Sequence, residues 1–414
     1  MSRHRPAGRG TGTASVGLKR DSGTIGAVLV EHAGASGAIT GSGKLIFANQ
    51  LRGLAALSVV LSHLGGVFVL MGPMVAWITS MPEVQAGQPA ILALTRWTYL
   101  NWGALGVAVF FLISGFVIPF SLRAQRPGPF LLARGLRIFP TLWTALLVEW
   151  LVVHAQSGFT GRGMAFGPLT YLWNALLLDT AIGNGFVDLV NWTLAIEVKF
   201  YILMAVLRPF VLKGRVLPFF VVSAGAIAVA VAQKQGVVPI PALLANEPMY
   251  LGFMLIGTVF HYRLTGLMQP APAIASMLGL GGLFLFCWRS GPMADQFFVV
   301  APNYLYGFAL FGLAYAGRAL FRPVRWLDRL ADLSYPLYLV HSVIGYSVMA
   351  LAMHVLGLGY AVALPIGFSA ALLLAALIHG LVERPSTELG RRLARSLSGR
   401  PQSRRAERSP GKGV

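Results

Sequence analysis

Long apolar runs alternate with short polar connections along most of this chain. Each run has the length that an α-helix needs to cross the hydrocarbon core of a bilayer. Ten such segments are predicted, at 46–72, 102–121, 136–154, 192–211, 216–235, 247–263, 272–288, 299–317, 333–354 and 359–382. The pattern therefore predicts an all-α protein, a polytopic transmembrane bundle of about ten helices.

Basic residues gather in every second connection between these segments. Arg123 and Arg126 follow the second segment, Lys213 and Arg215 follow the fourth, and Arg322 follows the eighth. Cytoplasmic loops of membrane proteins collect lysine and arginine. We therefore expect these connections, and both termini, to lie in the cytoplasm.

Three regions follow from this reading. Residues 1–43 lack a signal-peptide apolar run and are expected to form a flexible basic cytoplasmic tail, 44–386 the membrane domain, and 387–414 a second basic cytoplasmic tail. Residues 168–182 are apolar but short for a span, so we expect an outer interfacial or re-entrant segment. Treating 168–182 as a span would break the alternation of basic connections.

Composition narrows the function classes. The chain is 56% hydrophobic and 11% charged, whereas soluble domains carry roughly 25% charged residues. The net charge of +19 is explained by cytoplasmic loops and headgroup contacts with the lipid bilayer, so no nucleic-acid partner is expected. The single Cys287 allows no intrachain disulfide, and no His/Cys cluster has ligand spacing, so no metal site is predicted.

Arg52 and His63 are the first candidates for chemistry. They stand eleven residues apart, three helical turns, so they share one helix face about 16 Å apart. Charged and titratable side chains within a membrane segment are costly and usually functional. An imidazole suits general-base work near neutral pH, with an arginine anchoring phosphate below it. The structural alternative is that Arg52 snorkels to headgroups and His63 makes a helix contact.

Other polar side chains sit at comparable depths. Arg134 and Arg137 share a face at the inner end of the third segment, either as a phosphate clamp or as ordinary positive-inside residues. Glu197 lies inside the fourth segment at a depth similar to that of His63, so an imidazole is its sensible partner. Glu149 lies near the outer end of the third segment, where it would line an entrance. His341 alone is more typical of helix packing than of a site.

Together these residues resemble the integral-membrane acyltransferase family 3, whose members O-acylate sugars and some antibiotics. Four stretches and a closing pattern match in order: Arg52 with His63, Gly106 to Val117, Arg134 to Arg137, Trp192 to Tyr201, and Ser334 to His341 followed by Glu383-Arg-Pro385. Val198 and Lys199 depart from the acidic pair or Glu-Gln that the family commonly has near Glu197, which puts a second acid in doubt.

The resemblance implies an O-acyltransferase of the bacterial inner membrane. Its donor substrate would be acyl-CoA, most often acetyl-CoA, held by Arg52, Arg134 and Arg137, with no permanently bound cofactor. His63 and Glu197 would be catalytic. Further candidates are Ser114, Glu149, Trp192, Tyr201 and His341. The acceptor would be a hydroxyl of a cell-surface or lipid-linked glycan; the alternative is a sugar of a macrolide-type antibiotic.

Several alternatives stay open at this point. His63 would either take the proton of the acceptor hydroxyl, with Glu197 orienting the imidazole, or carry the acyl group as a covalent relay. A proton-coupled secondary transporter would also carry intramembrane His, Glu and Arg, although no inverted pair of broken segments is apparent. A non-catalytic scaffold would make the ordered motifs a coincidence.

Overall fold

The protein folds as a bundle of helices, and the structure, a computed structural model, describes residues 45–95, 99–183 and 185–398. The predicted tail at 1–43 and the end of the second tail lie outside these residues. No β-strand occurs in the described ranges, which confirms the predicted all-α class.

The helices in chain order are α2 (Ile46–Val60), the π-helix η1 (Leu61–Val67), α3 (Phe68–Leu70), α4 (Gly72–Thr79), α5 (Leu92–Thr95), α6 (Trp102–Ala124), α7 (Pro127–Thr160), α8 (Pro168–Ala175), α9 (Asp179–Ile182), α10 (Asn191–Val206), α11 (Arg208–Val211), α12 (Leu217–Lys234), α13 (Ala242–Leu264), α14 (Pro270–Ser290), η2 (Ala294–Gln296), α15 (Phe297–Ala316), η3 (Arg318–Leu320), α16 (Arg325–Val340), α17 (Val343–His354), α18 (Tyr360–Ile378), the π-helix η4 (His379–Glu383) and α19 (Arg384–Leu397).

Eight helical stretches of the described chain are long and apolar enough to cross a membrane, and a bent pair makes nine. That pair is α16 and α17, which meet at an angle of 71° within the predicted ninth segment. The predicted fourth segment is shorter than expected, because α10 has 16 residues and ends at Val206 before the brief helix α11. Residues 168–182 form only the short helices α8 and α9, which confirms that no single helix spans there.

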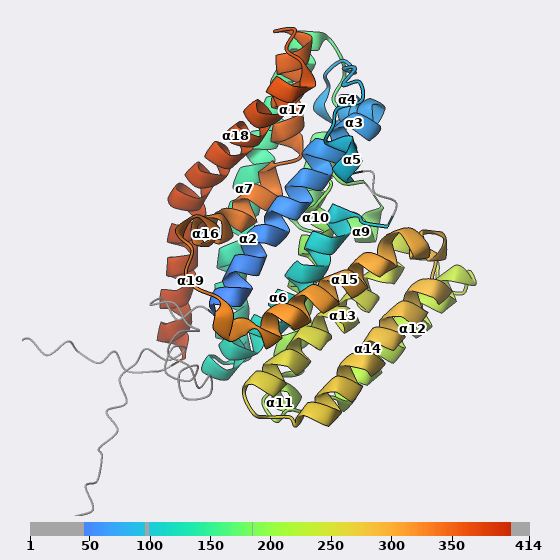
Figure 1. The fold of residues 1–414 in the computed structure, drawn as a ribbon, viewed down its shortest axis with the longest axis vertical. Helices are drawn as coiled ribbons and strands as arrows, with labels where there is room; N and C mark the ends of the chain where they lie inside the picture. The colour runs from blue at the N-terminus through green and yellow to red at the C-terminus, as the bar shows by residue number, and fades with distance from the viewer. Residues whose placement is uncertain (1–44, 96–98, 184, 399–414) are drawn as a thin grey trace, which may run out of the picture.

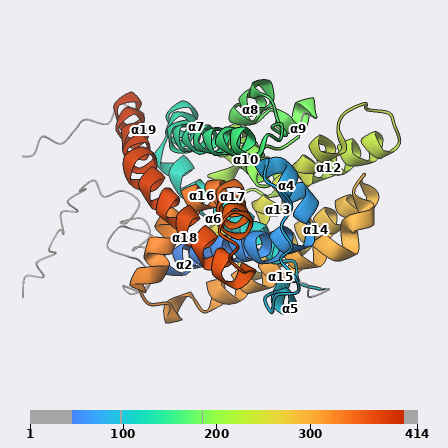
Figure 2. The same ribbon diagram turned by 90° about the horizontal axis from the view of Figure 1, so that it is seen from above.

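The helices form two groups with α6 between them. On one side α12, α13, α14 and α15 pack together, and α6 contacts both α13 and α15 (Figure 1). On the other side α16 contacts α2, α7 and α18, and seen from above it lies near the middle of the molecule (Figure 2). The helix α16 therefore lies between α2 and α7.

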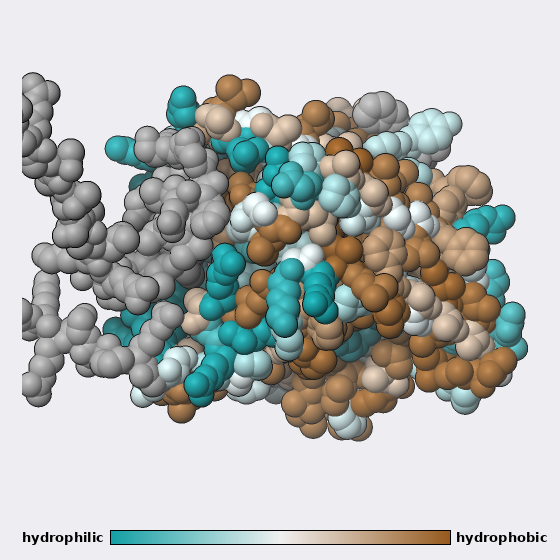
Figure 3. Space-filling view, turned by 90° about the horizontal axis from the view of Figure 1, so that it is seen from below, coloured by the Kyte–Doolittle hydropathy of each residue, from teal (hydrophilic) through white to brown (hydrophobic). Residues whose placement is uncertain are grey.

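Seen from below, the lower end of the bundle carries many hydrophilic side chains (teal), and hydrophobic side chains (brown) surround them (Figure 3). The connection between α6 and α7 and the helix α11 lie at this end (Figure 1). We call it the basic end, because these connections carry the arginines and lysines of the alternate loops. The predicted second tail begins here as α19, a helix packed against α7.

Glycines bring α6 into close contact with α13. A Cβ placed on Gly115 would lie against the carbonyl oxygen of Met254, and Gly257 faces Gly115 across the same crossing. Small residues let transmembrane helices approach this closely. The hydroxyl of Thr258 donates to the carbonyl of Gly115 over 3.0 Å. This crossing fixes the position of α6 along α13, and with it the position of Ser114, the residue before Gly115.

Candidate active site

Two histidines from distant parts of the chain form a stacked pair in the interior. His63 Nδ1 lies 2.8 Å from His341 Nε2, and the two rings are 4.9 Å apart with an interplanar angle of 9°. His341 is fully buried, whereas His63 keeps a partly exposed surface. The pair joins the first predicted segment to the ninth, 278 residues later.

Backbone carbonyls determine the tautomers of this pair. His341 Nδ1 lies 2.8 Å from the carbonyl oxygen of Tyr338 and 3.1 Å from that of Leu337. A carbonyl only accepts, so His341 Nδ1 carries the hydrogen and, in the neutral ring, Nε2 accepts. His63 Nδ1–H therefore donates to His341 Nε2. The Nε2 of His63 is left with a free lone pair, which is the state a general base requires.

Local departures from the α-helix place both rings. His63 lies in the π-helical turn η1, a feature often found at functional sites because it shifts side chains on a helix face. His341 follows α16 at the bend to α17. Beside the pair, a Cβ on Gly345 would come within 2.7 Å of Leu64, so the packing between η1 and α17 is tight.

A polar cavity of about 90 Å³ lies on the basic side of the histidine pair. It holds space for only a few water molecules. Arg52, Arg134 and Arg137 line it together with Glu197. The other polar lining residues are Ser114, Thr193, Tyr201, Ser334, Tyr335 and Tyr338. The structure thus brings the three predicted arginines to one place, although α2 and α7 are far apart in sequence.

The arginines of this cavity differ in their contacts. Arg134 donates to Ser121 Oγ over 2.5 Å and lies over the rings of Phe130 and Tyr201, 5.5 Å from each centroid. No described residue accepts a hydrogen bond from Arg52 or Arg137, and both guanidinium groups line the cavity. Three guanidinium groups against one carboxylate leave an excess of positive charge, which suits an anionic ligand such as phosphate.

Glu197 lies among these arginines and away from the imidazole expected as its partner. Its Oε1 accepts from Tyr201 over 2.5 Å and from Ser114 over 3.1 Å. His341 occupies the place beside His63 that the sequence assigned to Glu197. Because an arginine cluster stabilises a carboxylate better than one imidazole does, this position is physically reasonable. A catalytic role for Glu197 stays a prediction.

The opposite face of α10 is structural. Lys199 forms an ion pair with Glu247 of α13, and Trp192 packs against Tyr250 with ring centroids 5.5 Å apart. Trp192 therefore does not share the cavity with Tyr201 and Ser114. The candidate Glu149 is 1% exposed on α7, and neither of its carboxylate oxygens has a hydrogen-bond partner among the described residues.

Tyr338 connects the cavity to the histidine pair, and the sequence analysis did not single it out as a site residue. It lines the cavity, its ring lies 6.0 Å from that of His341, and its hydroxyl is 2.8 Å from Thr193 Oγ1. Phe110 packs edge-on against it at 5.5 Å. The motif from Ser334 to His341 could have indicated Tyr338, since Ser334, Tyr335 and Tyr338 all line the cavity.

Glu383 of the closing motif interacts electrostatically with Arg137 of this cavity. Its Oε2 lies 2.7 Å from Nδ1 of His379. No group of three or more His, Cys, Asp or Glu side chains suited to a metal ion occurs in the part of the chain that the structure describes.

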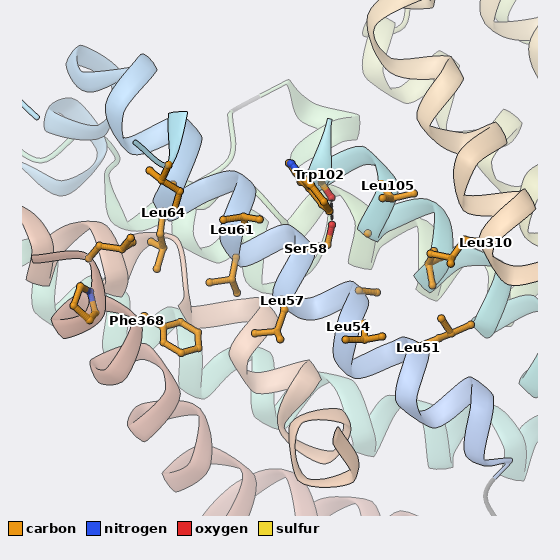
Figure 4. A pocket seen from close by; sticks show the side chains of 18 residues that line it. Leu51, Leu54, Leu57, Ser58, Leu61, Leu64, Trp102, Leu105, Leu310 and Phe368 are labelled. Atoms are coloured by element: carbon orange, nitrogen blue, oxygen red, sulfur yellow. Dashed lines mark hydrogen bonds between the residues drawn. The ribbon is translucent and has the colours of Figure 1, made fainter. Parts of the chain in front are cut away.

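A larger groove of about 590 Å³ runs along the other face of α2 (Figure 4). Leu51, Leu54, Leu57 and Leu61 line it from α2 and η1, and Phe368 lines it from α18. Ser58 lies within it but donates to the carbonyl of Trp102 over 2.6 Å. None of its lining residues is titratable, so the groove suits apolar chains and offers no acid–base chemistry.

Comparisons with known proteins show the family of this chain. The family described as Acyltransferase domain matches residues 45–380. Nodulation protein 10 of Rhizobium leguminosarum bv. viciae is 28% identical over 340 residues, covering 73% of this chain and 88% of its own. Exopolysaccharide production protein ExoZ of Rhizobium meliloti is 29% identical over 310 residues, covering 72% and 94%. No solved structure matches the chain significantly.

Proposed function

Because the chain belongs to this acyltransferase family, we propose that it is a membrane O-acyltransferase that moves an acyl group, most simply acetyl, from cytoplasmic acyl-CoA to a glycan hydroxyl. The observation that carries the proposal is the position of the histidine pair above the arginine cavity. A base with a free lone pair and an anion site are joined there by Tyr338.

The arginine cavity suits the donor. CoA joins a nucleotide that carries several phosphate groups to a long, thin pantetheine arm that ends in the thiol. Arg52 and Arg137 face the cavity without acceptors from the described residues, so they are free to bind phosphate oxygens. Along α2 and η1, Arg52 and His63 are about 16 Å apart, a separation suited to an extended arm. At about 90 Å³ the cavity must widen before the arm enters.

His63 acts first as the general base and then as the general acid. Its Nε2 takes the proton of the acceptor hydroxyl, and the hydroxyl oxygen forms a bond to the thioester carbonyl carbon. The carbon–sulfur bond then breaks, and the CoA thiolate receives the proton from the imidazolium. His341 Nε2 holds the Nδ1–H of His63 throughout, so it orients the ring and stabilises the transient positive charge.

The acceptor is proposed to be a cell-surface or lipid-linked glycan reached from the side opposite the basic end. One relative carries exopolysaccharide production in its name, which supports a polysaccharide hydroxyl over a sugar of a macrolide-type antibiotic. We place the protein in the bacterial inner membrane, with the basic end in the cytoplasm, because that side supplies acyl-CoA and satisfies the positive-inside rule.

The experiment is CoA release from acetyl-CoA by the protein in lipid nanodiscs, with and without a bacterial polysaccharide acceptor. Wild type should release CoA in proportion to acceptor acylation, and His63→Ala should lose both by at least about 10³-fold. The exposed His354→Ala serves as the matched control. Acylation that persists in a folded His63→Ala protein would refute the mechanism.

A further inference from the structure

A second buried polar cluster lies toward the end of α7 opposite the basic end. Glu149 is 1% exposed, and no described residue donates to either of its carboxylate oxygens. Asp188 is equally buried, and its charge acts on Glu149. A buried polar atom without a hydrogen bond destabilises the folded state. Such a group in a folded protein needs an explanation, and a ligand is one.

The neighbouring groups are fixed and leave further atoms unpaired. Asp188 Oδ1 accepts from the backbone amides of Val190 and Asn191, each over 2.8 Å, at the start of α10. Asn191 donates through Nδ2 to Asn174 over 3.3 Å. Its own Oδ1 is buried and has no partner among the described residues. The cluster therefore presents three unpaired oxygens on a rigid frame.

A hydrogen bond between α7 and α17 relates the position of this cluster to that of the histidine pair. On α7, Gln156 is two turns beyond Glu149 on the same face, and it donates to the carbonyl of Ser347 over 3.2 Å. Ser347 lies six residues beyond His341. Both spacings correspond to about 10 Å of helix, so Glu149 and His341 lie at similar distances along the chain from the contact between Gln156 and Ser347.

Tyr338 connects the two sets of residues. Its ring contacts His341, its hydroxyl contacts Thr193, and the charge of Asp188 acts on it. Tyr171, on α8, is partly exposed and interacts electrostatically with both Glu149 and Asp188.

We infer that Glu149, Asp188 and the side-chain oxygen of Asn191 form a subsite for adjacent hydroxyl groups of the acceptor sugar. This inference rests on the proposed function and deepens it. Sugar hydroxyls donate as well as accept, so they satisfy a carboxylate and an amide oxygen together. The unreactive hydroxyls would thereby select the acceptor.

The test is glycoside binding by the full chain in lipid nanodiscs without glycoside detergents. The probes are p-nitrophenyl β-glucoside, β-galactoside and N-acetyl-β-glucosaminide, and the readout is the shift in thermal unfolding midpoint with concentration. At least one probe should stabilise the wild type. Glu149→Gln should raise its Kd by about tenfold or more, because the NH2 group that replaces one carboxyl oxygen cannot accept a hydrogen bond from a sugar hydroxyl.

The chain offers a matched control. Asp179 is 1% exposed, and both of its carboxylate oxygens also lack a described partner. It interacts electrostatically with Lys199, Glu247 and Asp188, so its substitution controls for a change of charge near the subsite. Asp179→Asn should leave glycoside binding unchanged. Asp188→Asn is the second variant, since an asparagine oxygen can keep the backbone hydrogen bonds that start α10. It should weaken binding as Glu149→Gln does.

Each outcome has a defined meaning. No stabilisation of the wild type by any probe overturns the subsite, as does equal weakening in the Glu149 and Asp179 variants. If CoA release depends on His63 while glycosides fail to bind, the subsite fails and the acyltransferase stands. If binding depends on Glu149 while no acyl group is transferred, the acyltransferase fails and the sugar subsite stands.

Discussion

His63 and His341 form a hydrogen-bonded pair in which one ring fixes the tautomer of the other. The carbonyl of Tyr338 holds the Nδ1–H of His341, and His341 Nε2 in turn holds the Nδ1–H of His63. This arrangement does for the base what a carboxylate does in a Ser-His-Asp triad. An imidazole serves here without placing a second charge inside the membrane.

His341 should therefore act as a positioning residue with a measurable effect on turnover. His341→Phe keeps the ring volume but offers no acceptor to His63, so kcat should fall about 100-fold with little change in KM for acetyl-CoA. His341→Gln, whose oxygen can accept, should recover part of this loss. Steady-state kinetics over a range of pH checks both variants. An unchanged pH profile in His341→Phe would indicate a packing role only.

The arginine cavity should control donor affinity. Arg137→Gln removes a free guanidinium group from the cavity, so KM for acetyl-CoA should rise about tenfold or more, and Arg137→Lys should recover only part of it. Arg392→Gln on α19 is the control, because Arg392 is exposed and pairs with Glu388. A donor KM that changes equally in the Arg137 and Arg392 variants would mean that general surface charge sets the affinity.

Hydrophobic periodicity was sufficient for the helical class and for most spans, but not for the ends of helices. The predicted segment 192–211 is mostly apolar to its end, yet α10 stops at Val206 because Pro209 cannot continue the helix from the preceding turn. The segment that bends at His341 contains Pro336, but α16 continues through this proline to Val340, so the proline does not mark the bend. The helix α16 packs against α2, α7 and α18, and such contacts between distant segments are not encoded in a single apolar segment.

The sequence predicted which residues belong to the site better than it predicted which of them contact each other. Spacing along one helix correctly put Arg52 and His63 on the same α2–η1 stretch, because helical geometry is local. Partners across helices depend on rotation and tilt, so depth alone suggested Glu197 for His63. The structure gives that place to His341. Asp188 was missed because a loop carboxylate before a helix usually signals only a cap.

The crossing of α6 and α13 should be intolerant of a single methyl group. Gly115→Ala puts a Cβ against the carbonyl of Met254, so we expect a loss of about 1–3 kcal/mol and a lower thermal midpoint. Gly281→Ala, within α14, is the matched control because nothing lies within 4 Å of its added Cβ. Tryptophan fluorescence on heating in nanodiscs measures both variants. Equal midpoints would show that α6 can shift to accommodate the methyl group.

Asp188 should make stability depend on pH in a predictable direction. Burial raises its pKa to about 7, although the hydrogen bonds from Val190 and Asn191 act to lower it. The folded protein therefore holds a proton that the unfolded chain releases near pH 4. Between pH 4 and 7 the folded state binds more protons, so stability falls as pH rises, by an amount on the order of a few kcal/mol.

Asp188→Asn removes this titrating group, so the difference between the variant and the wild type reports the contribution of Asp188 alone to the pH dependence of stability. The variant's thermal midpoint, measured against that of the wild type in nanodiscs, should be similar at pH 4 and progressively higher at pH 6 and 8. The gain follows because the neutral amide needs no proton to stay buried, while its oxygen keeps the backbone hydrogen bonds at the start of α10. A difference that is constant across this range would mean that Asp188 stays ionised when buried, with a cation or solvent as its partner.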